Sequence, residues 1–187
     1  ENLRRAFEDV EIRATITGNR MRALGNTFEV GSSPGIRTEP DPTDVAEIAA
    51  VVTSARRLAD HVIVTIHAHE SAGATSVPAE FLPTFARAMI DAGATIFVGH
   101  GPHVLRGIEI YEGKPIFYSL GDFIFQNETL DRLPAENYAS YALGPDSHVA
   151  DFNDARYDMG RSGFPSRREI WESVIAMPRF RGGELVE

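Results

Sequence analysis

Two short apolar stretches of the sequence each end in a pair of histidines. The stretches are VIVTIHAHES, residues 62–71, and TIFVGHGPHVL, residues 95–105. The chain has six histidines, and these two stretches hold four of them: His67, His69, His100 and His103. Neutral imidazoles bind divalent transition metals at about 2.0–2.1 Å, and they also act as general acids or bases near neutral pH. The pattern therefore predicts a metal or catalytic site.

The elements around these histidines have the pattern of a strand–helix–strand unit. Apolar residues at helical spacing, with Pro42 in the first turn, predict a helix over 41–60, and a second helix is predicted over 78–93. The apolar runs 61–66 and 94–99 are typical of strands that are buried on both faces of a parallel sheet. Loops that leave neighbouring parallel strands meet at one edge of the sheet. We therefore expect all four histidines to reach one site.

The rest of the chain predicts a mixed sheet. The runs IEIY and PIFYSL flank the short turn EGK over residues 108–120, which indicates an antiparallel hairpin. Residues 10–18 alternate as a strand does, and residues 25–35 read as a strand or hairpin. Residues 127–170 are rich in Pro, Gly and polar side chains, so we expect long irregular loops with no more than one helix, followed by strands around a turn at 181–183. The fold class is α/β.

Composition excludes several classes of function. A net charge of −9 argues against a nucleic-acid partner, because phosphate backbones require a basic face. The chain has no cysteine, which excludes thiolate metal sites and cysteine nucleophiles. The chain begins at Glu1 rather than at a methionine. We therefore expect any targeting segment to lie outside this chain, and the cell envelope and the cytoplasm both stay open.

Side chains near the histidines are candidates for the remaining roles. A divalent ion, with Mn, Fe and Zn all open, can be bound by His67, His69, His100 and His103, with Glu70 and Asp122 nearby. His69, Glu70 or His103 can transfer a proton to or from a reacting group. Arg106 can hold an anionic substrate group, or it is a solvated charge at a strand end. Asp122 adds a charge that can contact substrate, or it caps a turn.

Three segments of the chain resemble the CapA family of capsule and poly-γ-glutamate synthesis proteins. They are IHAHE, the long run PAEFLPTFARAMIDAGATIFVGHGPHVLRGIEIYEGKPIFYSLGDFIF, and the closing FRGGELVE. The resemblance implies a calcineurin-like metallophosphoesterase fold, which is a four-layer α-β-β-α sandwich with one or two metal ions at a sheet edge. It also implies that His67, His100 and His103 match the histidines of that site. Gly101 and Asp122 depart from the family pattern, which more often has histidine and asparagine there.

The resemblance also implies what the chain does not contain. The family's earlier Gly-Asp and Asn-His segments have no counterpart here, so we expect residues 1–187 to be the C-terminal portion of one such domain. The implied function is a metal-dependent hydrolase of phosphoesterase type. Two alternatives stay open: a metal-assisted acid/base enzyme that acts on a peptide or polyglutamate, and a non-catalytic subunit of a membrane-associated polymer-synthesis complex.

Overall fold

The computed structural model describes residues 5, 13–33, 35–126 and 129–187, and it divides the chain into two compact units, Glu1–Ile36 and Arg37–Glu187. The first unit contains an antiparallel meander of β1 (Thr15–Thr17), β2 (Arg20–Ala23) and β3 (Asn26–Glu29). This confirms a strand within 25–35, whereas residues 10–12 of the strand predicted over 10–18 lie outside the described residues.

The second unit contains a four-stranded mixed sheet, as the sequence predicts. Its strands are β4 (Ile63–His67), β5 (Ile96–His100), β6 (Ile108–Tyr111) and β7 (Lys114–Phe117), in the order β4-β5-β7-β6. β5 runs parallel to both β4 and β7, whereas β6 pairs antiparallel with β7. Glu112 and Gly113 form the β6–β7 turn with φ values of 50° and 69°, which is the left-handed backbone of a tight hairpin turn.

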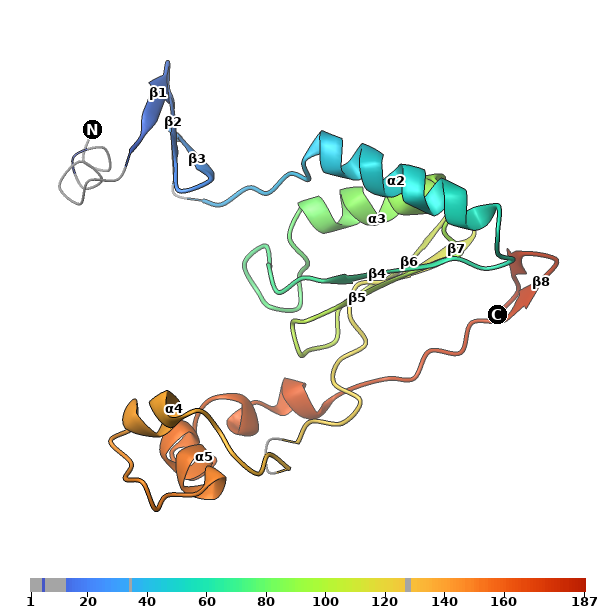
Figure 1. Cartoon of the computed structure of the whole chain (residues 1–187). Helices are drawn as coiled ribbons and strands as arrows, with labels where there is room; N and C mark the ends of the chain where they lie inside the picture. Colours follow the sequence, from blue (N-terminus) through green and yellow to red (C-terminus); the bar gives the residue numbers. More distant parts are fainter. Residues whose placement is uncertain (1–4, 6–12, 34, 127–128) are drawn as a thin grey trace. The chain divides into compact units, whose positions relative to one another are not determined.

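Two helices cover one face of this sheet (Figure 1). They are α2 (Pro42–Arg56) and α3 (Phe81–Asp91), close to the predicted helices. The Asp41 side chain caps α2 by accepting a hydrogen bond of 2.8 Å from the Thr43 amide. The core lies between these helices and the sheet, and it includes Val52, Leu82, Phe85, Met89, Ile90, Phe97, Ile116 and Tyr118.

The opposite face of the sheet is apolar and only partly covered, because Pro115 and Phe117 on it are buried beside the C-terminal segment 176–187. Ile63, Ile108 and Ile110 are 58%, 56% and 59% exposed, and all three lie on this face because side chains alternate along a strand. The expectation that 61–66 is buried on both faces is therefore wrong. β4 is an edge strand whose side chains alternate between the helix-covered face and the exposed face.

The C-terminal third of the chain has more helix than expected. It contains α4 (Ala135–Ala139), α5 (Val149–Tyr157) and two 3₁₀ turns, Phe164–Ser166 and Arg168–Trp171. The expectation of no more than one helix over 127–170 is wrong, because short helices bury too few side chains to leave a clear period in the sequence. β8 (Phe180–Arg181) and β9 (Glu184–Leu185) form the predicted closing hairpin. Among the described residues, the helices are too short or too polar to cross a membrane.

A charged network ties the β6–β7 hairpin to α3, and it predicts that the stability of the fold depends on pH. The Glu109 carboxylate accepts hydrogen bonds from Arg87 Nε at 2.8 Å and from Tyr118 Oη at 2.5 Å. The bond from Arg87, and then the bond from Tyr118, lower the pKa of Glu109 below its ordinary value. A depressed carboxyl pKa stabilises the folded state above the pKa of the unfolded chain, and this stability is lost as the pH falls through the folded pKa.

We therefore expect the urea midpoint of the native protein to fall more steeply between neutral pH and pH of about 3 than that of a Glu109→Gln variant. Urea unfolding at a series of pH values measures this difference. Glu112→Gln is the control, because it removes an exposed carboxylate from the turn of the same hairpin. Parallel curves for the native protein and Glu109→Gln would show that the network does not contribute to acid sensitivity.

Candidate metal and catalytic site

His67 and His100 lie side by side at the carboxyl ends of two parallel strands. They are register partners of β4 and β5, and both side chains point to the exposed face of the sheet. Their Nδ1 atoms are 2.8 Å apart. The sheet therefore brings together two imidazoles that are 33 residues apart in the sequence.

His69 extends this pair to three rings. Its Nε2 atom lies 2.9 Å from His67 Nε2, so the two nitrogens of His67 face two different histidines. The ring centroids of both neighbours lie 4.8 Å from that of His67. All three histidines are exposed. The structure thus brings His67, His69 and His100 together, as the strand pattern predicts.

Gly101 allows the loop after β5 to approach His67 closely. Its φ is +117°, and a Cβ there would lie 3.2 Å from both the His67 ring and the Ala68 amide nitrogen. A larger residue would push this loop away from the histidines. The absence of a side chain at Gly101 therefore lets this loop lie against His67.

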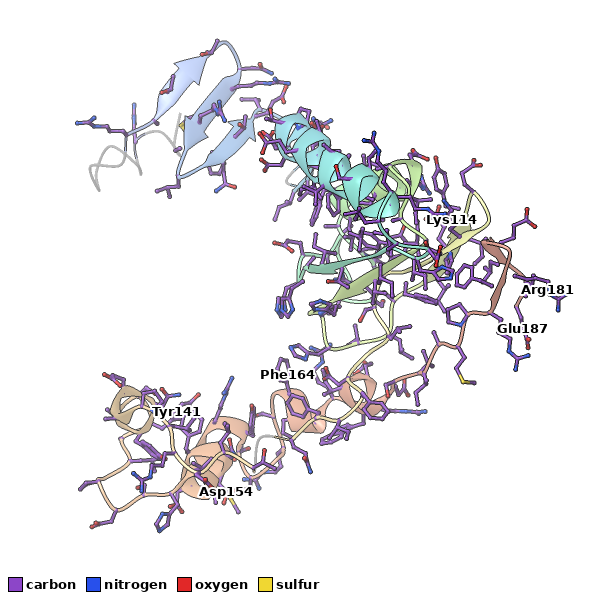
Figure 2. The ribbon with its side chains drawn as sticks, turned by 45° about the vertical axis from the view of Figure 1, so that its right-hand side comes forward. Lys114, Tyr141, Asp154, Phe164, Arg181 and Glu187 are labelled. Carbon is purple, nitrogen blue, oxygen red and sulfur yellow. The ribbon has the colours of Figure 1, made fainter. Side chains whose placement is uncertain are left out.

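His103 lies at the side of the cluster and has partners of its own. Its ring centroid is 5.7 Å from that of His69, and its Nδ1 atom lies 3.0 Å from Asp122 Oδ1. Phe164, labelled in Figure 2, comes from the 3₁₀ turn after α5, and its ring centroid lies 5.2 Å from that of His103. Phe125 lies 6.3 Å away on the same measure. His103 is thus held between a carboxylate and an aromatic wall.

Arg106 is buried behind the loop that carries His69 and Glu70. It is 5% exposed, and it donates hydrogen bonds to the carbonyl oxygens of Glu70 at 2.8 Å, Thr75 at 3.0 Å and His69 at 3.3 Å. Burial lowers its pKa, and the nearby Glu70 charge opposes this effect. Among the described residues, its Nη1 atom is buried without a hydrogen-bond partner. The Glu70 residue itself is exposed.

These contacts predict that Arg106 holds the 69–75 loop in place. We expect Arg106→Lys and Arg106→Met to increase hydrogen exchange of the loop amides, because neither side chain can make the fork of hydrogen bonds. Hydrogen-exchange mass spectrometry of peptides spanning 69–77 measures the change, and Arg87→Lys is a control on α3. A raised KM with unchanged loop protection would instead support a direct contact between Arg106 and an anionic substrate.

The donor atoms of this cluster suit a divalent metal ion by type. Two nitrogens bound to one tetrahedral ion at about 2.0–2.1 Å are separated by roughly 3.3 Å. The Nδ1 atoms of His67 and His100 are 2.8 Å apart, so they would have to separate slightly to bind one ion. His69 cannot join them on the same ion while His67 keeps this orientation, because it faces the other nitrogen of His67. Among the described residues, no group of three or more His, Asp or Glu side chains is arranged to hold a metal ion.

Comparison with known proteins identifies the family. The family model of the bacterial capsule synthesis protein PGA_cap matches residues 10–127. The chain belongs to the PGA_cap family. This match includes the sheet, both helices that cover it and all four clustered histidines.

Curated relatives of this chain are longer proteins. The uncharacterized protein y4sH of Sinorhizobium fredii is 38% identical over 170 residues, which are 87% of this chain and 37% of the relative. The PGA biosynthesis protein CapA of Bacillus subtilis is 42% identical over 59% of this chain and 26% of its own length. The capsule biosynthesis protein CapA of Bacillus anthracis is 34% identical over 64% of this chain and 31% of its own length. The chain thus spans about a third of the length of these PGA_cap relatives.

The aromatic wall around His103 was missed in the sequence. It is formed by Phe125, whose ring centroid lies 5.8 Å from that of Phe164 and 5.9 Å from that of Trp171. Phe164 lies in the region 127–170 that was expected to be irregular, and Trp171 directly follows it, so no period in the sequence marks either aromatic. Of these three aromatics, only Phe125 lies within a segment that resembles the family, three residues after Asp122.

Proposed function

We propose that this chain carries part of a metal-dependent hydrolase site of phosphoesterase type that serves capsule or poly-γ-glutamate synthesis. The observation that supports this most strongly is the convergence of His67, His69 and His100 at the carboxyl edge of a parallel sheet. Ligands of open α/β sheets bind at that edge. The family and the names of the two CapA relatives support the setting in polymer synthesis.

In this proposal His67 and His100 supply two ligands of one divalent ion. Such an ion lowers the pKa of a bound water and polarises a phosphoryl oxygen. His103 has one nitrogen committed to Asp122, so its second nitrogen is available to give a proton to the leaving oxygen. His69, the third ring of the cluster, and Glu70, the next residue, are both exposed and can contact a substrate. Arg106 holds their loop, and its Nη1 atom is buried without a partner among the described residues, so a contact with an anionic substrate group would require this loop to move.

We also propose that the exposed part of this apolar face is covered by a second sheet in a protein of the relatives' full length, which would form the α-β-β-α sandwich. Ile63, Ile108 and Ile110 are the apolar surface that such a layer would bury. The chain has no cysteine, so Ile110→Cys introduces a single thiol. A maleimide should label this thiol rapidly in the present chain and slowly in a protein of the relatives' full length. Equal labelling rates in both would count against a second layer.

The hydrolase proposal is tested by loading chelator-treated protein with Mn, Fe(II) or Zn, measuring the bound metal, and assaying a generic phosphodiester and poly-γ-glutamate in parallel. Bound metal with phosphodiester cleavage supports the proposal. Cleavage of the polyglutamate alone would favour acid/base chemistry on an amide. A protein of the relatives' full length with neither bound metal nor activity would contradict the hydrolase proposal and favour a binding or assembly role.

A further inference from the structure

We propose that Asp122 is a positioning residue that holds the neutral His103 imidazole with its proton on Nδ1, and so leaves Nε2 free to accept a proton and, from the imidazolium that results, to donate it. The Nδ1 atom lies 3.0 Å from Asp122 Oδ1 and 3.2 Å from Oδ2. An ionised carboxylate only accepts hydrogen bonds, so the nitrogen that faces it must carry the proton. This replaces the expectation that Asp122 contacts substrate or caps a turn.

The backbone of His103 is unusual, and the residue directly before Asp122 has to be a glycine. His103 has a φ of +59°, which is rare for a residue with a side chain, and Gly121, directly before Asp122, has a φ of +75°. A Cβ on Gly121 would also collide with the Glu172 carbonyl oxygen. The left-handed backbone of His103 persists only where the surrounding structure enforces it. The pair is therefore built into the two loops rather than formed by chance rotation of surface side chains.

The two loops are also joined directly to one another. The Arg106 amide donates a hydrogen bond of 3.0 Å to the Ser119 carbonyl oxygen, and Leu105 forms an isolated β-bridge with Leu120. His103 lies two residues before this bridge on one strand, and Asp122 lies two residues after it on the other. The distance between the two side chains is thus set by the backbone.

The surroundings of the pair strengthen its hydrogen bond. The side chains of His103 and Asp122 are 29% and 19% exposed, and Phe164 and Phe125 pack beside the imidazole. An apolar neighbourhood lowers the local dielectric, and a hydrogen bond to a charged acceptor is stronger there than in water. The tautomer of His103 is therefore selected by one interaction that solvent competes with only weakly.

A direct test reads the tautomer of His103 by long-range ¹H–¹⁵N NMR of the imidazoles at alkaline pH, where free imidazole is neutral. The native protein should show a protonated Nδ1 and an unprotonated Nε2 on His103. Asp122→Ala should shift the proton to Nε2, because the acceptor at Nδ1 is lost. Asp122→Asn should restore much of the native tautomer, because its amide oxygen can accept the same hydrogen bond. Asp146→Ala, which removes an exposed carboxylate in the segment before α5, should leave the signals unchanged.

A native His103 with its proton on Nε2, or an unchanged tautomer in Asp122→Ala, would overturn this proposal. The consequence for catalysis rests on the proposed function, so it has its own readout. If the protein hydrolyses phosphodiesters, Asp122→Ala should lower kcat about 10–100-fold with little change in KM, and Asp122→Asn should recover part of the loss. A protein without any hydrolysis would contradict the proposed function, whereas the NMR result would still decide the role of Asp122.

Discussion

A His100→Gln variant should lose divalent metal binding, and with it about 10²–10³-fold or more of any hydrolytic rate. The expectation rests on the Nδ1 atom of His100, which lies 2.8 Å from Nδ1 of His67. Glutamine keeps a polar side chain of similar length, but its amide is a much weaker metal ligand than imidazole. Elemental analysis and calorimetric titration with Zn or Mn measure the binding, and a phosphodiester assay measures the rate.

The matched control for this variant is His61→Gln. His61 precedes the opposite end of β4, where its ring lies 5.5 Å from that of Phe180, outside the cluster. We expect the metal content and the hydrolytic rate of His61→Gln to match those of the native protein. Undiminished metal binding in His100→Gln would remove His100 from the proposed site, and a similar loss in both variants would indicate a general effect on folding.

Gly99→Ala should destabilise the fold and disturb the site together. A Cβ at position 99 would lie 2.6 Å from the Tyr118 carbonyl oxygen, closer than real Cβ contacts come. That oxygen belongs to the backbone, so relief requires β5 to move away from the chain that follows β7. We expect a loss of about 1–3 kcal/mol in the free energy of unfolding, measured by urea titration. His100 is the next residue, so metal affinity should fall as well.

Gly107→Ala is the control for this substitution, because a Cβ there would have no atom within 4 Å and its φ is not left-handed. Its free energy of unfolding should change by less than about 0.5 kcal/mol. If Gly99→Ala had the same free energy of unfolding as the native protein, the end of β5 would be able to shift at little cost to make room for the added methyl group. In that case the close approach of the two strands does not position His100.

Local signals in the sequence account for much of the fold. Asp41 and Pro42 mark the start of α2, and the turn at Glu112 and Gly113 marks the β6–β7 hairpin, because capping and turn chemistry involve neighbouring residues. The histidines were predictable as a group because both pairs follow strands. Their meeting required only that β4 and β5 are adjacent and parallel.

Contacts between distant segments left no comparable signal. The pairing of His103 with Asp122 depends on how two loops cross, and the approach of Phe164 depends on a segment some 60 residues further along the chain. The exposed face of β4 was mispredicted for a similar reason. An apolar run such as VIVTI predicts a strand, but it does not indicate which layer packs against each face of that strand.

The histidine pair His67 and His100 forms only when β4 and β5 are aligned in the observed register. A slip of one residue between β4 and β5 would turn His67 toward the face that α2 and α3 cover, because side chains alternate along a strand. The same slip would carry Val64 and Ile66 out of the core. Only one alignment of the two strands both fills the core and brings the imidazoles together. Assembly of the histidine cluster is therefore coupled to correct folding of the strand–helix–strand unit that supports it.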